Sequence, residues 1–245
     1  MITARDLLGV GLYSPSEAAL YARVRPQLIS RWVYGTQGAR PSDPVFEPQL
    51  GNANDKIVTF LDFVQALAIR RLRNERHIPL QTIRQAYYRA REQFGVQYPF
   101  ATEGARIGLF GPFDRPDRQV IFICLNKKDE EDVQQYFQLT GRQHGSQLIG
   151  EVIMTYARFL EFHPDTKLAC KFTPFQSEDG VVTMDPEVRF GEPFIEATGY
   201  TAHALFNAYQ TEVTLNRAAE IYGVEPRHIQ LAIDFFDYLN PAAAA

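Results

Sequence analysis

Arginine is the side chain whose type and spacing point most directly to a chemistry in this sequence. Seven arginines fall between positions 70 and 91, and only Glu75 and Glu92 offset them there. A guanidinium group is planar and can donate two hydrogen bonds to one phosphate group. A cluster of arginines on helices therefore predicts contact with the phosphate backbone of a nucleic acid. A solvated helix face is the alternative. We favour phosphate contact, and the candidates are Arg70, Arg71, Arg73 and Arg76.

No set of side chains in the sequence has the spacing of an active site. The histidines are scattered without metal-ligand spacing, and there is no Gly-rich phosphate loop or nucleophile elbow. The acidic run 129–132 suits a helix start or a solvated turn better than a metal site. We therefore expect no enzyme activity, no metal and no cofactor.

The net charge of the chain conceals an uneven distribution. The 245 residues, 45% hydrophobic and 22% charged, fit one or two globular domains, and their formal net charge is −4. Residues 1–98 carry 13 basic and 8 acidic side chains, a balance of +5, and the remainder has a balance of −9. This asymmetry indicates two separate roles on one chain, unless the solvated faces differ by chance.

Cysteine usage and hydropathy indicate the compartment. Cys124 and Cys170 are far apart, so neither a disulfide framework nor a zinc site is predicted. The N-terminal sequence does not have the pattern of a signal peptide, and no apolar run reaches the length of a transmembrane helix. A cytoplasmic protein without membrane contact is expected.

Residues 14–34 have the pattern of two short helices joined by a tight turn. Ser14-Pro15-Ser16-Glu17 predicts a capping box at the first helix, and Pro26 is placed to begin the second. Such a helix-turn-helix presents the outer face of its second helix to the DNA major groove. The predicted outward-facing contacts are Arg25, Gln27, Ser30, Arg31 and Tyr34.

The order of residues 13–19 and 24–32 resembles the MerR-like winged helix-turn-helix family. That resemblance implies a wing over residues 35–50, with Arg40 able to meet the DNA backbone, followed by a helix pair. Residues 60–76 and 80–94 have the apolar stripes of such a pair, and Pro79 separates them. A two-helix interaction module is the alternative to DNA contact.

The middle of the chain is the least informative part. Short strands are predicted at 105–110, 119–125 and 167–172, whereas 147–162 fits either a helix or strands. The sequence therefore predicts an α+β protein of three parts: a winged helix-turn-helix domain (1–98), a small strand-bearing connecting domain (99–180) and a three-helix, helix-turn-helix-like domain (181–245).

The last part is predicted to hold helices at about 201–209, 215–222 and from 226 onward, with Thr201 and Thr214 as N-caps. Residues 181–245 carry three arginines against nine acidic side chains, a balance of −6. An acidic surface is poorly suited to phosphate, so dimerisation or partner binding is the expected use. Weaker candidates for DNA or partner contact are Arg217, Arg227, His228 and Gln230.

Asp185-Pro186, the Gly191-x-Pro193-x-Ile195 spacing and residues 218–224 resemble a small antitoxin domain of the unknown-function type, found beside PIN-like toxins. The whole order resembles VapB-type antitoxins. This resemblance implies a protein that neutralises a PIN-like ribonuclease toxin and represses its own operon. A homodimer on operator DNA is expected. A MerR-like ligand-sensing transcriptional regulator and a protein-interaction module without DNA contact are the alternatives.

Overall fold

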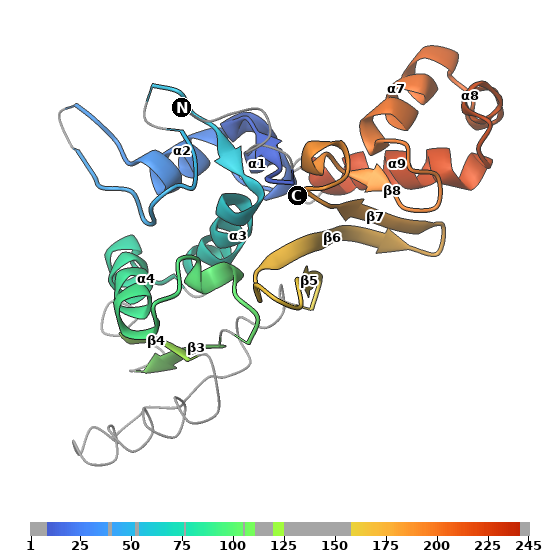
Figure 1. Cartoon of the computed structure of the whole chain (residues 1–245). Helices are drawn as coiled ribbons and strands as arrows, with labels where there is room; N and C mark the ends of the chain where they lie inside the picture. The colour runs from blue at the N-terminus through green and yellow to red at the C-terminus, as the bar shows by residue number, and fades with distance from the viewer. Residues whose placement is uncertain are drawn as a thin grey trace.

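The structure is a computed structural model that describes residues 9–38, 41–51, 54–75, 77–104, 106–110, 120–124 and 158–240. Its architecture is α+β, as the sequence predicts. The helices of residues 15–94 lie on one side of the molecule and those of residues 202–239 on the other, with a four-stranded sheet between them (Figure 1).

The helix-turn-helix is held by a short ladder at its base. Strand β1 (Leu12–Tyr13) pairs antiparallel with β2 (Val58–Thr59), and helices α1 (Pro15–Tyr21) and α2 (Pro26–Tyr34) lie between these strands in the chain. The predicted capping box is confirmed. The Ser14 N–H donates to the Glu17 carboxylate at 2.8 Å, and the Glu17 N–H donates to Ser14 Oγ at 3.2 Å.

Helix α3 (Phe60–Asn74) is the most buried element of this part, with ten of its 15 residues buried. Helix α4 (Leu80–Phe94) and the short turn η2 (Pro99–Ala101) cover it on one side. On another side the ring of Phe63 meets that of Phe172 with centroids 5.7 Å apart. A helix buried all round carries no amphipathic stripe, so this environment explains why apolar residues run through residues 63–69.

Two sheets follow. Strands β3 (Arg106–Phe110) and β4 (Val120–Cys124) form a hairpin, close to the predicted positions. The second sheet is antiparallel in the order β5 (Leu160–Phe162), β6 (Ala169–Ser177), β7 (Gly180–Met184) and β8 (Phe194–Ile195).

The expected domain boundary at residue 180 is wrong, because it falls inside the β6–β7 hairpin. Ser177 pairs with Gly180, and Phe175 with Val182. The same hairpin also contributes to both hydrophobic cores: Met184 joins the N-terminal core and Val182 the C-terminal one. The sheet therefore packs against both hydrophobic cores and does not belong to a separate connecting domain. The acidic run 129–132 and residues 147–157 lie outside the described residues.

The C-terminal unit has the three predicted helices, α7 (Ala202–Glu212), α8 (Leu215–Tyr222) and α9 (Pro226–Leu239). Thr201 and Thr214 act as the expected N-caps, accepting from the N–H groups of Ala204 and Arg217. Helix α9 lies against β7 and β8. Among the described residues, none of these helices or the earlier ones has the length and hydropathy that crossing a bilayer requires.

The two helix-turn-helix units are copies of one backbone motif, offset by 200 residues. Both begin at a hydroxyl N-cap, Ser14 or Thr214, and both contain a left-handed residue at the turn, Arg23 (φ 53°) or Gly223 (φ 63°). The next residue then donates its N–H back to the preceding helix, at 2.9 Å for Val24 to the carbonyl of Ala19 and at 3.0 Å in the equivalent bond of the second unit. Identical residues occupy positions 18/218, 19/219, 24/224, 26/226 and 29/229.

The N-terminal helix-turn-helix contacts the C-terminal unit directly. The Tyr13 hydroxyl donates to the carbonyl of Gly191 at 2.8 Å, at the end of the helical turn η4 (Arg189–Gly191). The guanidinium of Arg23 lies 4.2 Å from the ring centroid of Tyr238 on α9, a cation–π contact. The first helix-turn-helix is thus fixed to the C-terminal unit through β1 and the turn after α1.

Asp62 provides a test of how α3 is anchored. It is fully buried and accepts the N–H groups of Gln49 at 3.1 Å and Thr59 at 3.2 Å. Burial raises its pKa from 3.8 to about 6, against the opposing effect of these hydrogen bonds. Because the folded protein then holds this proton more tightly than the unfolded chain, Asp62 makes stability fall as the pH rises from about 4 through 6.

We predict that Asp62→Asn removes this fall, which amounts to at most about 3 kcal/mol. The free energy of urea unfolding, measured between pH 4 and 7, would show the variant gaining on the wild type as the pH increases. Asp165→Asn, at an exposed turn, is the control and should follow the wild-type curve. An Asp62→Asn curve parallel to the wild type would contradict the prediction.

Candidate nucleic-acid interface

A groove of about 550 Å³ runs between α2 and the loop that follows it. Gln27, Ser30, Arg31 and Tyr34 of α2 line one wall, all of them predicted contacts. The other wall includes Thr36, Gln37 and Lys56 from the loop of residues 35–57, which we call the wing. The structure therefore brings four of the predicted residues to one concave surface.

The helical period places these side chains outward. Ile29, Trp32 and Val33 are buried at 1% exposure or less, and they fix the inner face of α2. Gln27 and Arg31, four residues apart, then lie together on the opposite face and are exposed. Arg25 is exposed at the N-cap, where the helix dipole is positive. The exposed hydrogen-bond donors of α2 therefore lie at its first turn and along one face.

Tyr34 has a different role from the predicted one. Its hydroxyl donates to the carbonyl of Ile57, at the far end of the wing. Burial raises the pKa of Tyr34 to about 12, so the phenol stays protonated and keeps donating. Tyr34 thus lines the groove, and its hydroxyl links the wing to α2 by a hydrogen bond.

The start of the wing is closed by a bridge between Thr36 and Ser42. Thr36 and Ser42 exchange backbone hydrogen bonds of 2.8 and 3.0 Å, and their hydroxyls lie 2.9 Å apart. Gly35 ends α2 with φ 73°, and a Cβ there would lie 2.2 Å from the Ser42 carbonyl oxygen. Only glycine fits this position, which explains the residue that the sequence places there. Arg40, predicted for the wing, lies outside the described residues.

Lys56 is a groove residue that the sequence analysis missed. It is exposed on the wing side, opposite the α2 wall that carries Arg31. Because it lies 25 residues from Arg31 in the chain, no local spacing connects the two. An ammonium at this rim is suited to a phosphate oxygen, as Arg25 is at the other end of the helix.

The arginines predicted to contact phosphate make contacts with other residues of the same chain. Arg70 is half-buried, which lowers its pKa, and it interacts electrostatically with Tyr238 and Arg23. Arg71 pairs with Glu75 at 3.4 Å, and Arg73 donates to the carbonyl of Ile78 at 2.9 Å. Arg76 lies outside the described residues. Arg70, Arg71 and Arg73 thus have partners within the chain, and their contact with phosphate stays a prediction.

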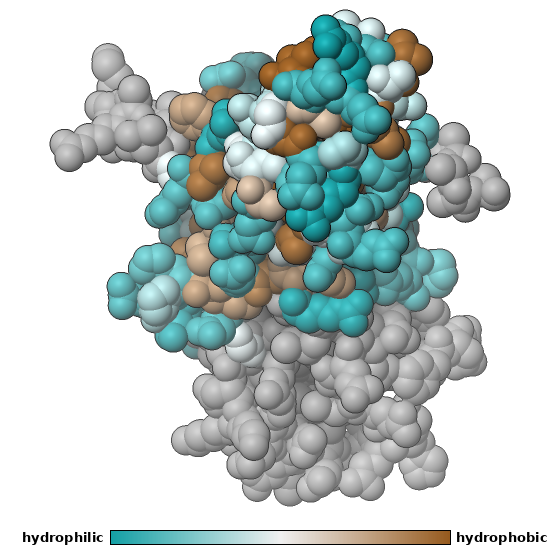
Figure 2. Space-filling model, turned by 90° about the vertical axis from the view of Figure 1, so that its right-hand side faces the viewer, coloured by the Kyte–Doolittle hydropathy of each residue, from teal (hydrophilic) through white to brown (hydrophobic). Residues whose placement is uncertain are grey.

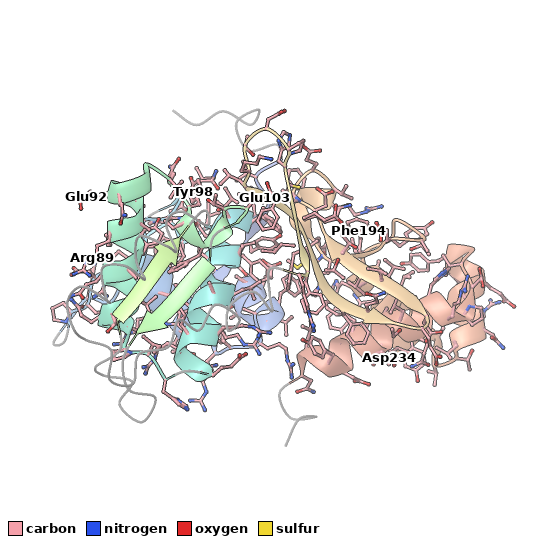
Figure 3. The ribbon with its side chains drawn as sticks, turned by 90° about the horizontal axis from the view of Figure 1, so that it is seen from below. Arg89, Glu92, Tyr98, Glu103, Phe194 and Asp234 are labelled. Carbon is pink, nitrogen blue, oxygen red and sulfur yellow. The ribbon has the colours of Figure 1, made fainter. Side chains whose placement is uncertain are left out.

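The arginines of α4 hold the wing. Arg84 donates to the carbonyls of Asp43 and Pro44, the latter at 2.7 Å. Arg91 pairs with Glu47 at 2.5 Å. Arg89, by contrast, is exposed on the outer side of α4 near Glu92 (Figure 3). Two of these guanidinium groups thus position the groove wall without lining it.

The candidates in the second unit do not form an equivalent surface. His228 is wrong as a contact, because it is only 6% exposed. Arg227 pairs with Glu225 at 3.0 Å, and Gln230 donates to Asp234, a residue on the lower edge of α9 in Figure 3. Leu231, the counterpart of Arg31, is fully buried and would contact a Cβ at Gly180 at 3.1 Å. At the position of Arg31, α9 therefore packs against the sheet, whereas Arg227, the counterpart of Gln27, stays exposed.

We predict that Arg84→Ala loosens the wing while leaving the fold intact. Loss of the two carbonyl contacts should raise amide hydrogen exchange at Thr36 and Ser42 by about tenfold or more, since local opening costs less. Arg89→Ala, on the same helix, should leave these amides unchanged. Equal exchange in the two variants would show that Arg84 does not anchor the wing.

Comparisons with known proteins give a family match at the C-terminal end and a similar solved structure. Residues 182–236, from β7 to α9, match the model of a family described as "Protein of unknown function (DUF433)". Among curated protein sequences, no significant match is found. A crystal structure of Rv2018 from Mycobacterium tuberculosis is similar in fold, with a TM-score of 0.64 and 18% identity over 93% of this chain and 99% of that chain. At this identity the likeness extends to the fold alone. A DUF433 domain therefore forms the C-terminal end of a chain whose whole fold has a solved counterpart.

Proposed function

We propose that this chain binds specific DNA sequences through α2 and the wing. The observation that carries the proposal is the groove lined by Gln27, Ser30 and Arg31 of α2 and by Lys56 of the wing. Arg25 is exposed at the N-cap of the same helix. In the major groove, Arg31 would donate in pairs to guanine O6 and N7, and Gln27 would pair with adenine. Arg25 and Lys56 would hold phosphates and set the register.

The second unit serves a different purpose in this proposal. The counterpart of Arg31 in this unit is the buried Leu231, and Arg217 and Arg227 are each paired with a neighbouring carboxylate. We therefore assign DNA reading to the first unit alone. The acidic C-terminal unit is the part expected to hold a protein partner.

The partner that we propose is a PIN-like ribonuclease toxin, so that the chain acts as an antitoxin and represses its own operon as a homodimer. Support for this part comes from the resemblance of the residue order to VapB-type antitoxins and from the family match at residues 182–236. The acidity of residues 181–245, with nine acidic side chains against three arginines, is consistent with a partner other than nucleic acid.

We predict that Arg31→Ala weakens binding to the DNA upstream of the gene by about 1–3 kcal/mol, that is, by roughly 5- to 150-fold. Fluorescence anisotropy at several salt concentrations would measure both the affinity and its salt slope. Arg227→Ala removes the same charge from the equivalent helix of the second unit and should bind as the wild type does. If both variants lose affinity equally, the assignment of reading to α2 fails.

The antitoxin part has its own test. The full chain, co-expressed with the product of the neighbouring reading frame, should co-purify with it as a stable complex and suppress its RNA cleavage. Arg31→Ala should retain this suppression, because the groove is reserved for DNA. A neighbouring product that neither binds nor cleaves RNA would overturn the antitoxin role while leaving the DNA-binding proposal standing.

A further inference from the structure

A pocket of about 170 Å³ lies where α3 meets the four-stranded sheet, and it shares no lining residue with the groove of α2. Its walls come from the residues before β1, the wing, the start of α3, the β5–β6 hairpin and the turn after β7. An apolar cavity of similar size holds a molecule as large as benzene. This pocket therefore has room for a ligand of about six or seven heavy atoms.

The buried residues of the pocket lining are apolar, whereas its exposed side chains are polar. Phe60, Ala169 and Pro186 are buried, and Thr166 and Glu187 are exposed. This division is typical of a small-molecule site, because the apolar part contributes affinity and a few polar groups fix the orientation of the ligand.

Gln49 contributes a hydrogen-bond acceptor for which the described chain offers no donor. Its backbone N–H donates to the carboxylate of Asp62, at 3.1 Å from one oxygen and 3.3 Å from the other. Its side-chain Oε1 is buried and accepts no hydrogen bond from any residue that the structure describes. A buried oxygen of this kind is unfavourable and uncommon in folded proteins. A ligand with an N–H or O–H group would supply the missing donor.

Carboxylates give the pocket a negative potential. Burial raises the pKa of the Cys170 thiol in the pocket wall, and three neighbouring carboxylates raise it further. Lys171 has the opposite effect on this thiol, but its ammonium pairs with one of the three, Glu161, at 3.7 Å. The other two, Asp185 and Glu187, form no ion pair within the described ranges of the chain. A cation is therefore the charge that the pocket favours.

We propose that this pocket binds a small organic amine in its ammonium form. The ammonium group would donate to Oε1 of Gln49, and the exposed carboxylate of Glu187 would balance its charge. A short aliphatic body would lie against Phe60 and Pro186. An alcohol of the same shape could donate to Gln49 but would leave the carboxylate without a counter-charge, and an acid would be repelled.

The bound amine would act on the wing, and this use rests on the proposed function. Gln49 lines the pocket, and its N–H holds the end of the wing to Asp62 at the start of α3. The wing in turn forms one wall of the DNA groove. A ligand that stabilises Gln49 in this position favours the anchored wing. Amine and DNA should then raise each other's affinity by the same factor.

The pocket leaves the outer side of the C-terminal unit to a protein partner. None of the described residues that line it belongs to α7, α8 or α9. Figure 2 looks onto the side of the molecule where these helices lie, and apolar residues there are interleaved with hydrophilic ones. Amine and protein partner can therefore be bound at the same time.

Protein-detected NMR of the full chain without DNA tests the site with isopentylamine, isopentanol and isovalerate, which share one carbon skeleton. At neutral pH the amine is protonated and should shift the side-chain amide signals of Gln49 saturably. Its dissociation constant should be about 0.1–1 mM, ordinary for a ligand of this size. The alcohol should bind about tenfold more weakly, and the acid should not bind. Equal affinity for amine and alcohol, or no saturable shift with the amine, would overturn the inference.

Two variants and a matched control locate the site. Gln49→Leu removes the acceptor but keeps the N–H that binds Asp62, and it should weaken amine binding by about tenfold or more. Glu187→Gln removes an exposed charge and should weaken it by about two- to fivefold. Glu178→Gln makes the same change at the exposed β6–β7 turn and should bind the amine as the wild type does. Amine affinity that is unchanged in Gln49→Leu and Glu187→Gln would place the ligand elsewhere and sink the proposal.

A second arm separates this pocket from the DNA groove. Saturating isopentylamine should raise DNA affinity about fivefold in fluorescence anisotropy, and it should have no effect in Gln49→Leu. Arg31→Ala should bind the amine as the wild type does. A wild type that binds the amine but no DNA would overturn the proposed function and leave the site standing. Amine binding without any change in DNA affinity would overturn the action on the wing.

Discussion

The burial of α3 is the constraint on which the rest of the structure depends. A helix with apolar residues on all faces cannot be stable unless other elements enclose it. Here the enclosing elements come from distant parts of the chain: the helix-turn-helix, α4 with η2, and β6, whose Phe172 meets the ring of Phe63. Because α3 begins at the Thr59 cap, and Asp62 also binds the N–H of Gln49, the same helix end fixes the return of the wing. The groove wall and the core are therefore parts of one packing arrangement.

The packing around α3 and the wing gives arginines of the same type different contacts. Arg70 is half-buried and interacts electrostatically with Tyr238, and Arg84 donates to backbone carbonyls of the wing. Arg31 faces outward because Ile29, Trp32 and Val33 take the inner positions of α2. A guanidinium can contribute to DNA binding in two ways, by touching the DNA or by holding the loop that touches it. In the proposed function, Arg84 and Arg91 of α4 belong to the second class, and Arg31 of α2 to the first.

Local patterns predicted the parts of the fold that local physics controls. The capping box at Ser14, the helix starts at Pro26 and Pro226 and the N-caps at Thr201 and Thr214 follow from contacts within four residues. The packing of these helices against distant parts of the chain could not be predicted from such local patterns. The helical period puts His228 on some face of α9 but does not say which face meets the sheet. Lys56 joined the groove only through the β1–β2 ladder that brings the wing back beside α2.

The repeated helix-turn-helix explains why two motifs of the same shape can differ in use. The backbone of the motif is set by the cap, the left-handed turn residue and the small buried alanines, which both copies share. Its two outer faces are free to vary, and each copy here has one face covered and one face open. In the first copy the α1 face is docked and the α2 face is open and basic. In the second, Leu231 on α9 is docked on the sheet and the α8 face is open. In the proposed function the first motif binds DNA and the second unit holds a protein partner, because the face that remains in solvent determines what a motif can bind.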